Sequence, residues 1–463
     1  MTVQKNKQKT KRIKESLFDN IERIHNLVYK KHVKKRKIKP LLKKVYKQTV
    51  RLEDRYLSFF DDKLRKKLEK ILPNNVYIKN HKKENEFANT IELLVDGEEV
   101  FSKIIKNTNE AKKNILVQMF IWKNDYIGNK IGKALLEAAD RGVKVEIRKD
   151  ALGSIFEVGG YGGRGFFQSN NGFKLKFISK LIGTFYKEPN KNKVKNFKIS
   201  DNLCAHPNVK VMKDENLKDH SKYYIFDDKV FMTGGMNIGD EYYKNTKMNK
   251  ARHDFMVNMK SRALVQKFRK RIRGNDVDDF DYGSSVEFSI NIIDGKKKQF
   301  EIVNKLLELL DKSKKQVVLE MAYLGEQSIN DKLVEIANKG VKVKLIIPKK
   351  ANLQDDLNKM MAAKLLEATN GKIKVMLYPK AMHSKAVLID DEVSFIGSAN
   401  LNFGALHNLK ETNVIVDDAN CKFTKKFKKT LKADTKISKK VKNKKRLKFG
   451  FIRAWAEYVI GRI

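Results

Sequence analysis

The residues best suited to chemistry occur in one pattern that the chain repeats. Each copy has a histidine, a lysine two positions later, an aspartate five positions after the lysine, and an asparagine 17 positions after the histidine. The first copy consists of His220, Lys222, Asp227 and Asn237, and the second consists of His383, Lys385, Asp390 and Asn400. One such match can arise by chance in a lysine-rich chain, but two copies with the same internal spacing are not accidental.

The residue types of this pattern suit a phosphoryl group. Each copy is predicted to form a strand, a turn and a returning strand, with first strands at 220–226 and 383–389. Residues two apart in a strand point to the same face, so each histidine projects beside its lysine. The imidazole can attack phosphorus or transfer a proton, while the ammonium and amide groups bind the non-bridging oxygens. The aspartates fall at the turns, where we expect them to hold the hairpins rather than react.

Two half-sites predict one complete site. Displacement at phosphorus through a covalent intermediate needs a nucleophile on one side and a general acid on the other, and two histidines facing each other would supply both. The sequence has no Walker-type phosphate loop, and no cluster of acidic residues in it is typical of a magnesium site. We therefore expect lysines, without a metal or other cofactor, to neutralise the phosphate.

These motifs resemble those of the phospholipase D superfamily. The stretch from Thr233 to Tyr242 is similar to the segment that follows the first motif in bacterial cardiolipin synthases. The stretches Gly397–Asn402 and Asn408–Val414 are similar to the segment after their second motif. The resemblance covers roughly residues 95 to 430. It implies two α/β halves around one active site, a phosphohistidine intermediate and no metal.

The resemblance also implies a role for each matching residue. It favours His220 as the nucleophile and His383 as the acid that protonates the leaving alcohol. The implied catalytic set is His220, Lys222, Asp227, His383, Lys385 and Asp390. The implied phosphate-binding residues are Asn237, Asn400 and Ser398, besides the two lysines. Family members keep an acidic residue behind each histidine, and by position in the sequence Glu411 is assigned to His383 and Asp254 to His220.

Three departures from the family pattern qualify this assignment. The serine of Gly-Ser-x-Asn is replaced in the first copy by Gly235. The usual Trp-Arg-Asp is Arg252-His253-Asp254, and we interpret His253 as a neighbour of the site rather than a reactive group. The synthases usually begin with two membrane-spanning helices, whereas no stretch here approaches the roughly 18 apolar residues that a span needs.

Composition predicts a peripheral protein with basic extensions. The net charge is +44, of which residues 1–80 carry +17 and residues 421–463 carry +14. Such segments bind anionic headgroups or phosphate backbones, although a solubilising lysine-rich surface is the alternative. The sequence has no secretory signal, and Cys204 and Cys421 form no disulfide framework, which fits a reducing compartment. We therefore expect a peripheral location on the cytoplasmic face of the cell membrane.

The last residues add an apolar stripe to this charge. Ile452, Trp455, Val459 and Ile463 fall at helical spacing after a basic run. An amphipathic helix of this kind suits the interface of a bilayer, but packing on the body of the protein is an equal alternative.

The repeat extends beyond the motifs and predicts the domain organisation. Residues 134–147 pair with 332–345, each as a helix, a glycine and an alternating strand. The expected fold is therefore α/β, with two homologous halves of mixed sheet flanked by helices. The predicted segments are a basic helical extension at 1–80, the halves at 81–273 and 284–430, a linker at 274–283 and a basic tail at 431–463. Residues 153–165, which are rich in glycine, are predicted to form a loop beside the site.

The sequence thus favours a phosphatidyltransferase of the cardiolipin synthase type, with anionic phospholipids and the membrane surface as partners. A phospholipase D hydrolase shares the same chemistry and stays open. A nucleic-acid phosphodiesterase of the same superfamily is the alternative from another class. The chain lacks an aromatic and basic stacking platform of the kind that single-strand binders use, which favours lipid.

Overall fold

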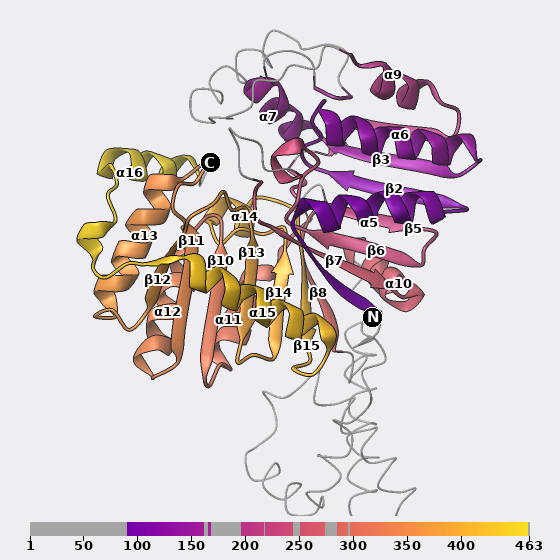
Figure 1. Cartoon of the computed structure of the whole chain (residues 1–463). Coiled ribbons are helices and arrows are strands. Elements are labelled where there is room, and N and C mark those ends of the chain that lie inside the picture. The colour runs from indigo at the N-terminus through magenta and orange to yellow at the C-terminus, as the bar shows by residue number, and fades with distance from the viewer. Residues whose placement is uncertain are drawn as a thin grey trace, which may run out of the picture. The chain divides into compact units, whose positions relative to one another are not determined.

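A computed structural model describes residues 90–161, 165–167, 196–216, 218–243, 251–273, 285–294 and 297–461. All of these residues belong to one structural unit (Figure 1). The predicted basic extension at 1–80 and the predicted linker at 274–283 lie outside the described residues.

The first half is built on a seven-stranded mixed sheet with the order β1-β7-β6-β5-β2-β3-β4. Its strands are β1 (Ile91–Val95), β2 (Asn114–Met119), β3 (Lys144–Asp150), β4 (Val209–Asn216), β5 (Tyr223–Phe226), β6 (Val230–Gly234) and β7 (Phe255–Lys260). Its helices are α5 (Asp96–Glu110), α6 (Tyr126–Asp140), α7 (Ala151–Tyr161), α9 (Lys198–Ala205) and α10 (Arg262–Ile272). Helices α5 and α6 lie side by side over the sheet (Figure 1).

The second half is built on a nine-stranded mixed sheet with the order β16-β12-β11-β10-β13-β14-β15-β8-β9. Its strands are β8 (Val286–Asp294), β9 (Lys297–Phe300), β10 (Gln316–Met321), β11 (Lys342–Pro348), β12 (Lys374–Tyr378), β13 (Lys385–Ile389), β14 (Val393–Gly397), β15 (Glu411–Asp417) and β16 (Lys439–Lys440). Its helices are α11 (Ile302–Asp311), α12 (Gln327–Asn338), α13 (Asp355–Ala368), α14 (Phe403–His407), α15 (Lys422–Ile437) and α16 (Phe451–Ile460).

The two sheets share one topology, which confirms the predicted α/β fold with two homologous halves. The order β8-β15-β14-β13-β10-β11-β12 repeats that of the first sheet, and in both halves the three strands on one side are parallel. The second sheet adds β9 at one edge and β16 at the other. The hairpins β5–β6 and β13–β14 that follow the two histidine motifs occupy equivalent central positions.

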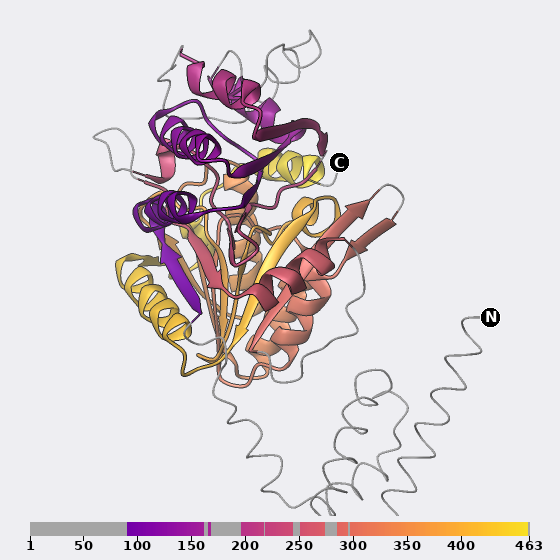
Figure 2. The same ribbon diagram turned by 90° about the vertical axis from the view of Figure 1, so that its right-hand side faces the viewer.

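Successive side chains along a strand point to opposite faces of the sheet, and in both sheets the two faces are apolar. In β2, Ile115 and Val117 pack beneath α5 and α6, whereas Leu116 faces the other way. The opposite faces of the two sheets share one core, to which α10 and α15 contribute, and strands β6 and β7 contact β14 and β15. Helix α15 of the second half also lies against β1 of the first (Figure 2). This shared core fixes the two histidine motifs relative to each other.

Two sequence predictions about element boundaries need correction. Residues 151–161 form helix α7 rather than part of a glycine-rich loop. Gly153 stands in this helix because a Cβ there would lie 1.8 Å from the carbonyl oxygen of Phe120, so the glycine permits close approach. Helix α15 crosses the predicted boundary at residue 430 and ends at Ile437, since Phe427 and Leu431 continue one buried stripe.

Candidate active site

Each histidine motif leads into a hairpin whose turn is pinned by its aspartate. Asp227 and Asp390 both have positive φ, as the tight turns of such hairpins require. The Asp227 carboxylate accepts hydrogen bonds from three consecutive backbone N–H groups at the start of β2, at 2.7–3.1 Å. Asp390 accepts three equivalent bonds at the start of β10, at 2.7–2.9 Å. The aspartates therefore tie each hairpin to its neighbouring strand, at the end of the hairpin opposite to the histidines.

The two halves exchange backbone hydrogen bonds beside the histidines. In the first half, Asp219 forms a parallel β-bridge with Lys410 of the second half. The N–H of the next residue, His220, donates to the Lys410 carbonyl at 3.0 Å. The segment that carries His383 pairs in the same way with the first half, since His383 N–H donates to the His253 carbonyl at 2.8 Å. Residue 411 of one half is thereby placed beside His220, and residue 254 of the other half beside His383.

This exchange corrects the sequence assignment of the two acidic residues. Glu411 lies 2.8 Å from Nδ1 of His220, not of His383. Asp254 lies 2.9 Å from Nδ1 of His383, not of His220. Spacing along the chain suggested pairing within each half, but the backbone bridges carry each acid across to the other half. A carboxylate that accepts the Nδ1 proton leaves Nε2 unprotonated and available for attack.

The serine and glycine that precede the two asparagines contact these same acids. The Ser398 hydroxyl donates to Glu411, and the Thr412 N–H donates to Ser398 Oγ at 3.0 Å. Ser398 was predicted to bind phosphate, but its proton is directed at the carboxylate behind His220. A Cβ at Gly235 would lie 2.5 Å from Asp254 Oδ1, so the first half has no room for a serine unless Asp254 moves.

The two motif lysines are fully buried among these groups. Lys222 Nζ donates to the His220 carbonyl, and Lys385 Nζ donates to the His383 carbonyl and lies 2.9 Å from its Nδ1. Burial lowers the pKa of Lys222 to about 8, although the charges of Glu411 and Asp254 partly oppose the shift. Burial likewise lowers the pKa of Lys385 to about 7. The nearby carboxylates do not fully offset the cost of burying the two positive charges, and this favours binding of an anion.

Both histidines are neutral near pH 7. Burial lowers the pKa of His220 to about 4, against the opposing charge of Glu411. Burial and then the charge of Lys385 lower the pKa of His383 well below its usual value. A neutral imidazole whose Nδ1 faces a carboxylate is the form that can attack phosphorus.

The motif asparagines are both buried but differ in their contacts. Asn237 Oδ1 accepts the Ile121 N–H at 3.2 Å, and its amide nitrogen donates to the Tyr242 hydroxyl at 3.5 Å. Asn400 is buried, and its Oδ1 has no hydrogen-bond partner among the described residues. The Asn400 amide is therefore less constrained than that of Asn237.

Sequence reasoning missed several polar residues that lie behind His383. Ser384 donates its hydroxyl to the buried Glu320 of β10 at 2.7 Å. Glu320 in turn lies near His253 and near Asp434 of α15. Glu320 and Asp434 come from distant parts of the chain and belong to no motif, so spacing gave no signal for them.

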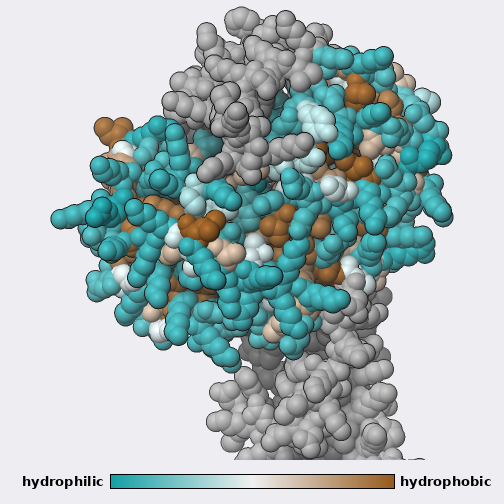
Figure 3. Space-filling model, in the orientation of Figure 1, coloured by the Kyte–Doolittle hydropathy of each residue, from teal (hydrophilic) through white to brown (hydrophobic). Residues whose placement is uncertain are grey.

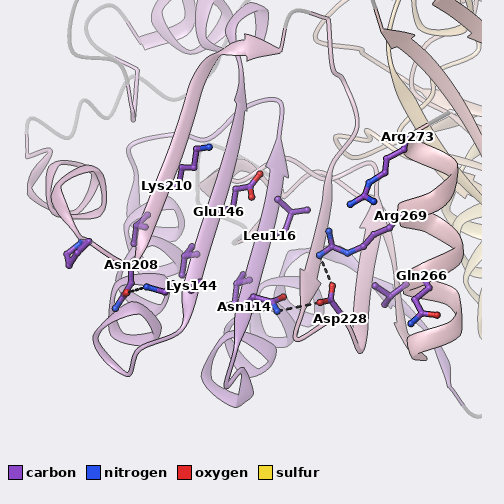
Figure 4. A pocket seen from close by; sticks show the side chains of 15 residues that line it. Asn114, Leu116, Lys144, Glu146, Asn208, Lys210, Asp228, Gln266, Arg269 and Arg273 are labelled. Carbon is purple, nitrogen blue, oxygen red and sulfur yellow. Dashed lines mark hydrogen bonds and ion pairs between the residues drawn. The ribbon is translucent and has the colours of Figure 1, made fainter. Parts of the chain in front are cut away.

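One surface cavity lies in the first half, away from the histidines. It encloses about 620 Å³ between β2, β3, β4 and α10 (Figure 4). Asn114 and Asp228 line it at the turn end of the first hairpin, away from His220. Arg269 pairs with Asp228 across it at 2.7 Å. This cavity is therefore not the site of the two histidines.

Comparisons with known proteins place the chain in a family. A sequence model described as "Cardiolipin synthase, PLD-like domain" matches residues 104–274 and 306–435, more than half of the chain. The chain belongs to this phospholipase D-like family. A cardiolipin synthase of Clostridium perfringens (strain 13 / Type A) is 26% identical over 383 residues, which cover 76% of this chain and 72% of that protein. The major cardiolipin synthase ClsA of Bacillus subtilis (strain 168) is 24% identical over 375 residues, which cover 76% and 70%.

A solved structure shares the fold. The phosphatidylserine synthase of Haemophilus influenzae Rd KW20 matches with a TM-score of 0.58 at 15% identity, over 84% of this chain and 100% of that chain. This likeness concerns the fold alone. The family match and the curated relatives confirm the predicted class, a phosphatidyltransferase of the phospholipase D superfamily. None of the described helices is long and apolar enough to cross a membrane.

Proposed function

We propose that this enzyme is a cardiolipin synthase that acts through a phosphohistidine. Nε2 of His220 attacks the phosphorus of one phospholipid, and a phosphatidyl group becomes bonded to the ring as the headgroup alcohol leaves. The hydroxyl of a phosphatidylglycerol then attacks the same phosphorus and the P–N bond breaks. The observation that carries the proposal is the pair of buried, neutral histidines, each held at Nδ1 by a carboxylate from the other half.

The two histidines have complementary tasks in this reaction. His383 donates a proton from Nε2 to the leaving alcohol and later removes the proton of the incoming hydroxyl. An anionic phosphate between Lys222 and Lys385 raises the pKa of the nearby imidazole, so binding of the substrate helps to load His383 with its proton. The lysines and the Asn400 amide bind the non-bridging oxygens as charge shifts during transfer.

We propose that the reaction takes place at an anionic membrane surface to which the tail contributes. Helix α16 packs on α13 through the buried Ala454, and Glu457 accepts the Leu357 N–H at 2.9 Å. Its other face leaves Ile452 83% and Trp455 59% exposed, and apolar side chains project at this edge of the surface (Figure 3). One face of the helix thus packs on the body of the protein, and the exposed face supports the proposal of a membrane contact. A basic segment beside exposed aromatic and aliphatic groups suits anionic headgroups.

Lipid analysis tests the proposed function. The full chain is incubated with phosphatidylglycerol vesicles, and the products are identified by mass spectrometry. We expect cardiolipin and glycerol, and no product from a His220→Ala variant. Phosphatidic acid as the main product would assign a phospholipase D hydrolase instead. Unchanged lipid together with cleavage of a nucleic-acid diester would assign the phosphodiesterase alternative.

A further inference from the structure

Three buried side chains converge behind His383 at the seam between the halves. His253 lies just before β7, Glu320 in β10 and Asp434 in α15, and all three are buried. Nε2 of His253 lies 3.2 Å from Glu320 Oε1 and 3.4 Å from Asp434 Oδ2. One ligand atom from each residue lies within 4.8 Å of the other two.

Each of the three residues has a buried polar atom that makes no hydrogen bond of good geometry. His253 Nε2, Glu320 Oε2 and Asp434 Oδ2 are buried and have no hydrogen-bond partner among the described residues. Buried polar atoms are nearly always paired, because leaving one without a partner costs about 1–3 kcal/mol of desolvation. Glu320 Oε1, the oxygen that lies near His253, accepts the Ser384 hydroxyl, so Oε2 is the Glu320 oxygen left unpaired. Each of the three clustered residues therefore has a buried polar atom that is open to a ligand.

We infer that His253, Glu320 and Asp434 bind a divalent transition-metal ion, with zinc as the best fit. One imidazole nitrogen and two carboxylate oxygens are ligands that zinc accepts. Two ligand atoms bonded to a tetrahedral zinc at about 2.0–2.1 Å lie about 3.3–3.4 Å apart. The distances from His253 Nε2 to Glu320 Oε1, 3.2 Å, and to Asp434 Oδ2, 3.4 Å, match this separation. Both are longer than the roughly 2.7–2.9 Å of a charge-assisted hydrogen bond.

The other nitrogen of His253 supports this inference. Nδ1 lies 2.6 Å from Oδ1 of Asp96, the first residue of α5. A histidine that binds a metal through one nitrogen usually donates the other N–H to a carboxylate, which fixes the ring and its tautomer. Asp96 thus occupies the position of that carboxylate, and it comes from a fourth element of the fold.

Charge balance also favours a dication. Glu320 and Asp434 place two carboxylates in the interior, and the only ion pairs found for them among the described residues are with His253. A protonated His253 would neutralise one of the two charges. A dication with a neutral imidazole neutralises both, and uncompensated buried charge is costly.

The ion would fasten the two halves where the second histidine motif begins. His253 N–H donates to the Ala381 carbonyl at 3.0 Å, and the His253 carbonyl accepts the His383 N–H at 2.8 Å. Ser384 reaches the same cluster through its bond to Glu320. The metal is therefore structural and lies behind the reacting histidines, so the inference is independent of the lipid substrate and of transfer at His220.

Elemental analysis provides the test. The full chain, purified through a tag without histidine and dialysed against metal-free buffer, is expected to retain about one zinc per chain. His253→Gln and Asp434→Asn should lose it. His206→Gln is the matched control, because His206 also lies 3.2 Å from a carboxylate, that of Asp140, but has no third ligand in the described residues. That variant should keep its zinc.

A second readout does not depend on activity. Metal-free wild-type protein should melt at a lower temperature and recover when zinc is added, and cobalt should give a visible absorption band. Neither response should occur in Asp434→Asn, a conservative change that serves if His253→Gln does not fold. Wild-type protein that holds no metal and does not respond to zinc or cobalt would overturn the inference. Zinc retained equally by both variants would also overturn it, because the ion would then lie elsewhere.

Discussion

Replacing Glu411 by glutamine should block formation of the covalent intermediate and leave the fold intact. Glu411 lies 2.8 Å from Nδ1 of His220 and accepts the hydroxyl proton of Ser398. Glutamine keeps the size of the side chain, but its NH₂ group can face Nδ1. The ring then carries its proton on Nε2, the atom that has to attack phosphorus.

The expected loss is large because the ring cannot correct its tautomer through solvent. His220 is only 9% exposed, and burial lowers its pKa to about 4, so it stays neutral near pH 7. In a serine protease, the same change behind a catalytic histidine lowers kcat by about 10⁴-fold. We expect a loss of about 10³–10⁴-fold, equivalent to about 4–5.5 kcal/mol in activation free energy.

The assay is intact-mass detection of phosphatidylated protein after rapid quenching, with lipid turnover measured in parallel. Glu326→Gln is the matched control, since Glu326 lies 3.1 Å from Nε2 of His407 outside the proposed site. That variant should turn over normally. Turnover of Glu411→Gln within about threefold of wild type would refute the tautomer argument. Loading that is lost in Asp254→Asn but kept in Glu411→Gln would make His383 the nucleophile.

Three further outcomes follow from the structure. The pH profile of kcat/KM should rise through about 4 as His220 loses its proton, and fall above about 7 as first Lys385 and then, near 8, Lys222 lose theirs; a flat profile across this range would contradict these roles. Asp390→Asn should lower the free energy of unfolding by about 1–3 kcal/mol, measured by denaturant titration, because it weakens three backbone hydrogen bonds. Trp455→Ser should weaken binding to anionic vesicles by about tenfold or more in a flotation assay, since a fully inserted side chain contributes about 1.5–3 kcal/mol; unchanged flotation would remove α16 from the membrane contact.

The sequence predicted the parts of this enzyme that depend on local pattern. The repeated motifs, the hairpins after each histidine and the duplicated helix–strand units all follow from short-range periodicity. The position of Asp227 at a turn was also predictable, because aspartate tolerates the positive φ that the turn requires.

What could not be predicted depends on contacts between distant segments. Glu411 lies against His220, and Asp254 lies against His383, because two backbone bridges join the halves. The spacing of residues along the chain does not indicate these bridges. Gly153 was interpreted as part of a loop, but it stands in a helix that passes close to another backbone. A glycine signals conformational freedom and close approach equally, and only the packed structure distinguishes them.

The exchange of acids also bears on why two such similar halves stay together. If each half oriented its own histidine, the halves could separate with both rings still held in the reactive tautomer. Here each ring depends on a carboxylate that the other half supplies, so separation removes the orienting group from both histidines at once. Buried lysines near a phosphate site would also become solvated and regain ordinary pKa values. The proposed chemistry therefore requires the two halves to stay in contact. A dication bound by His253, Glu320 and Asp434 would stabilise this contact beside His383.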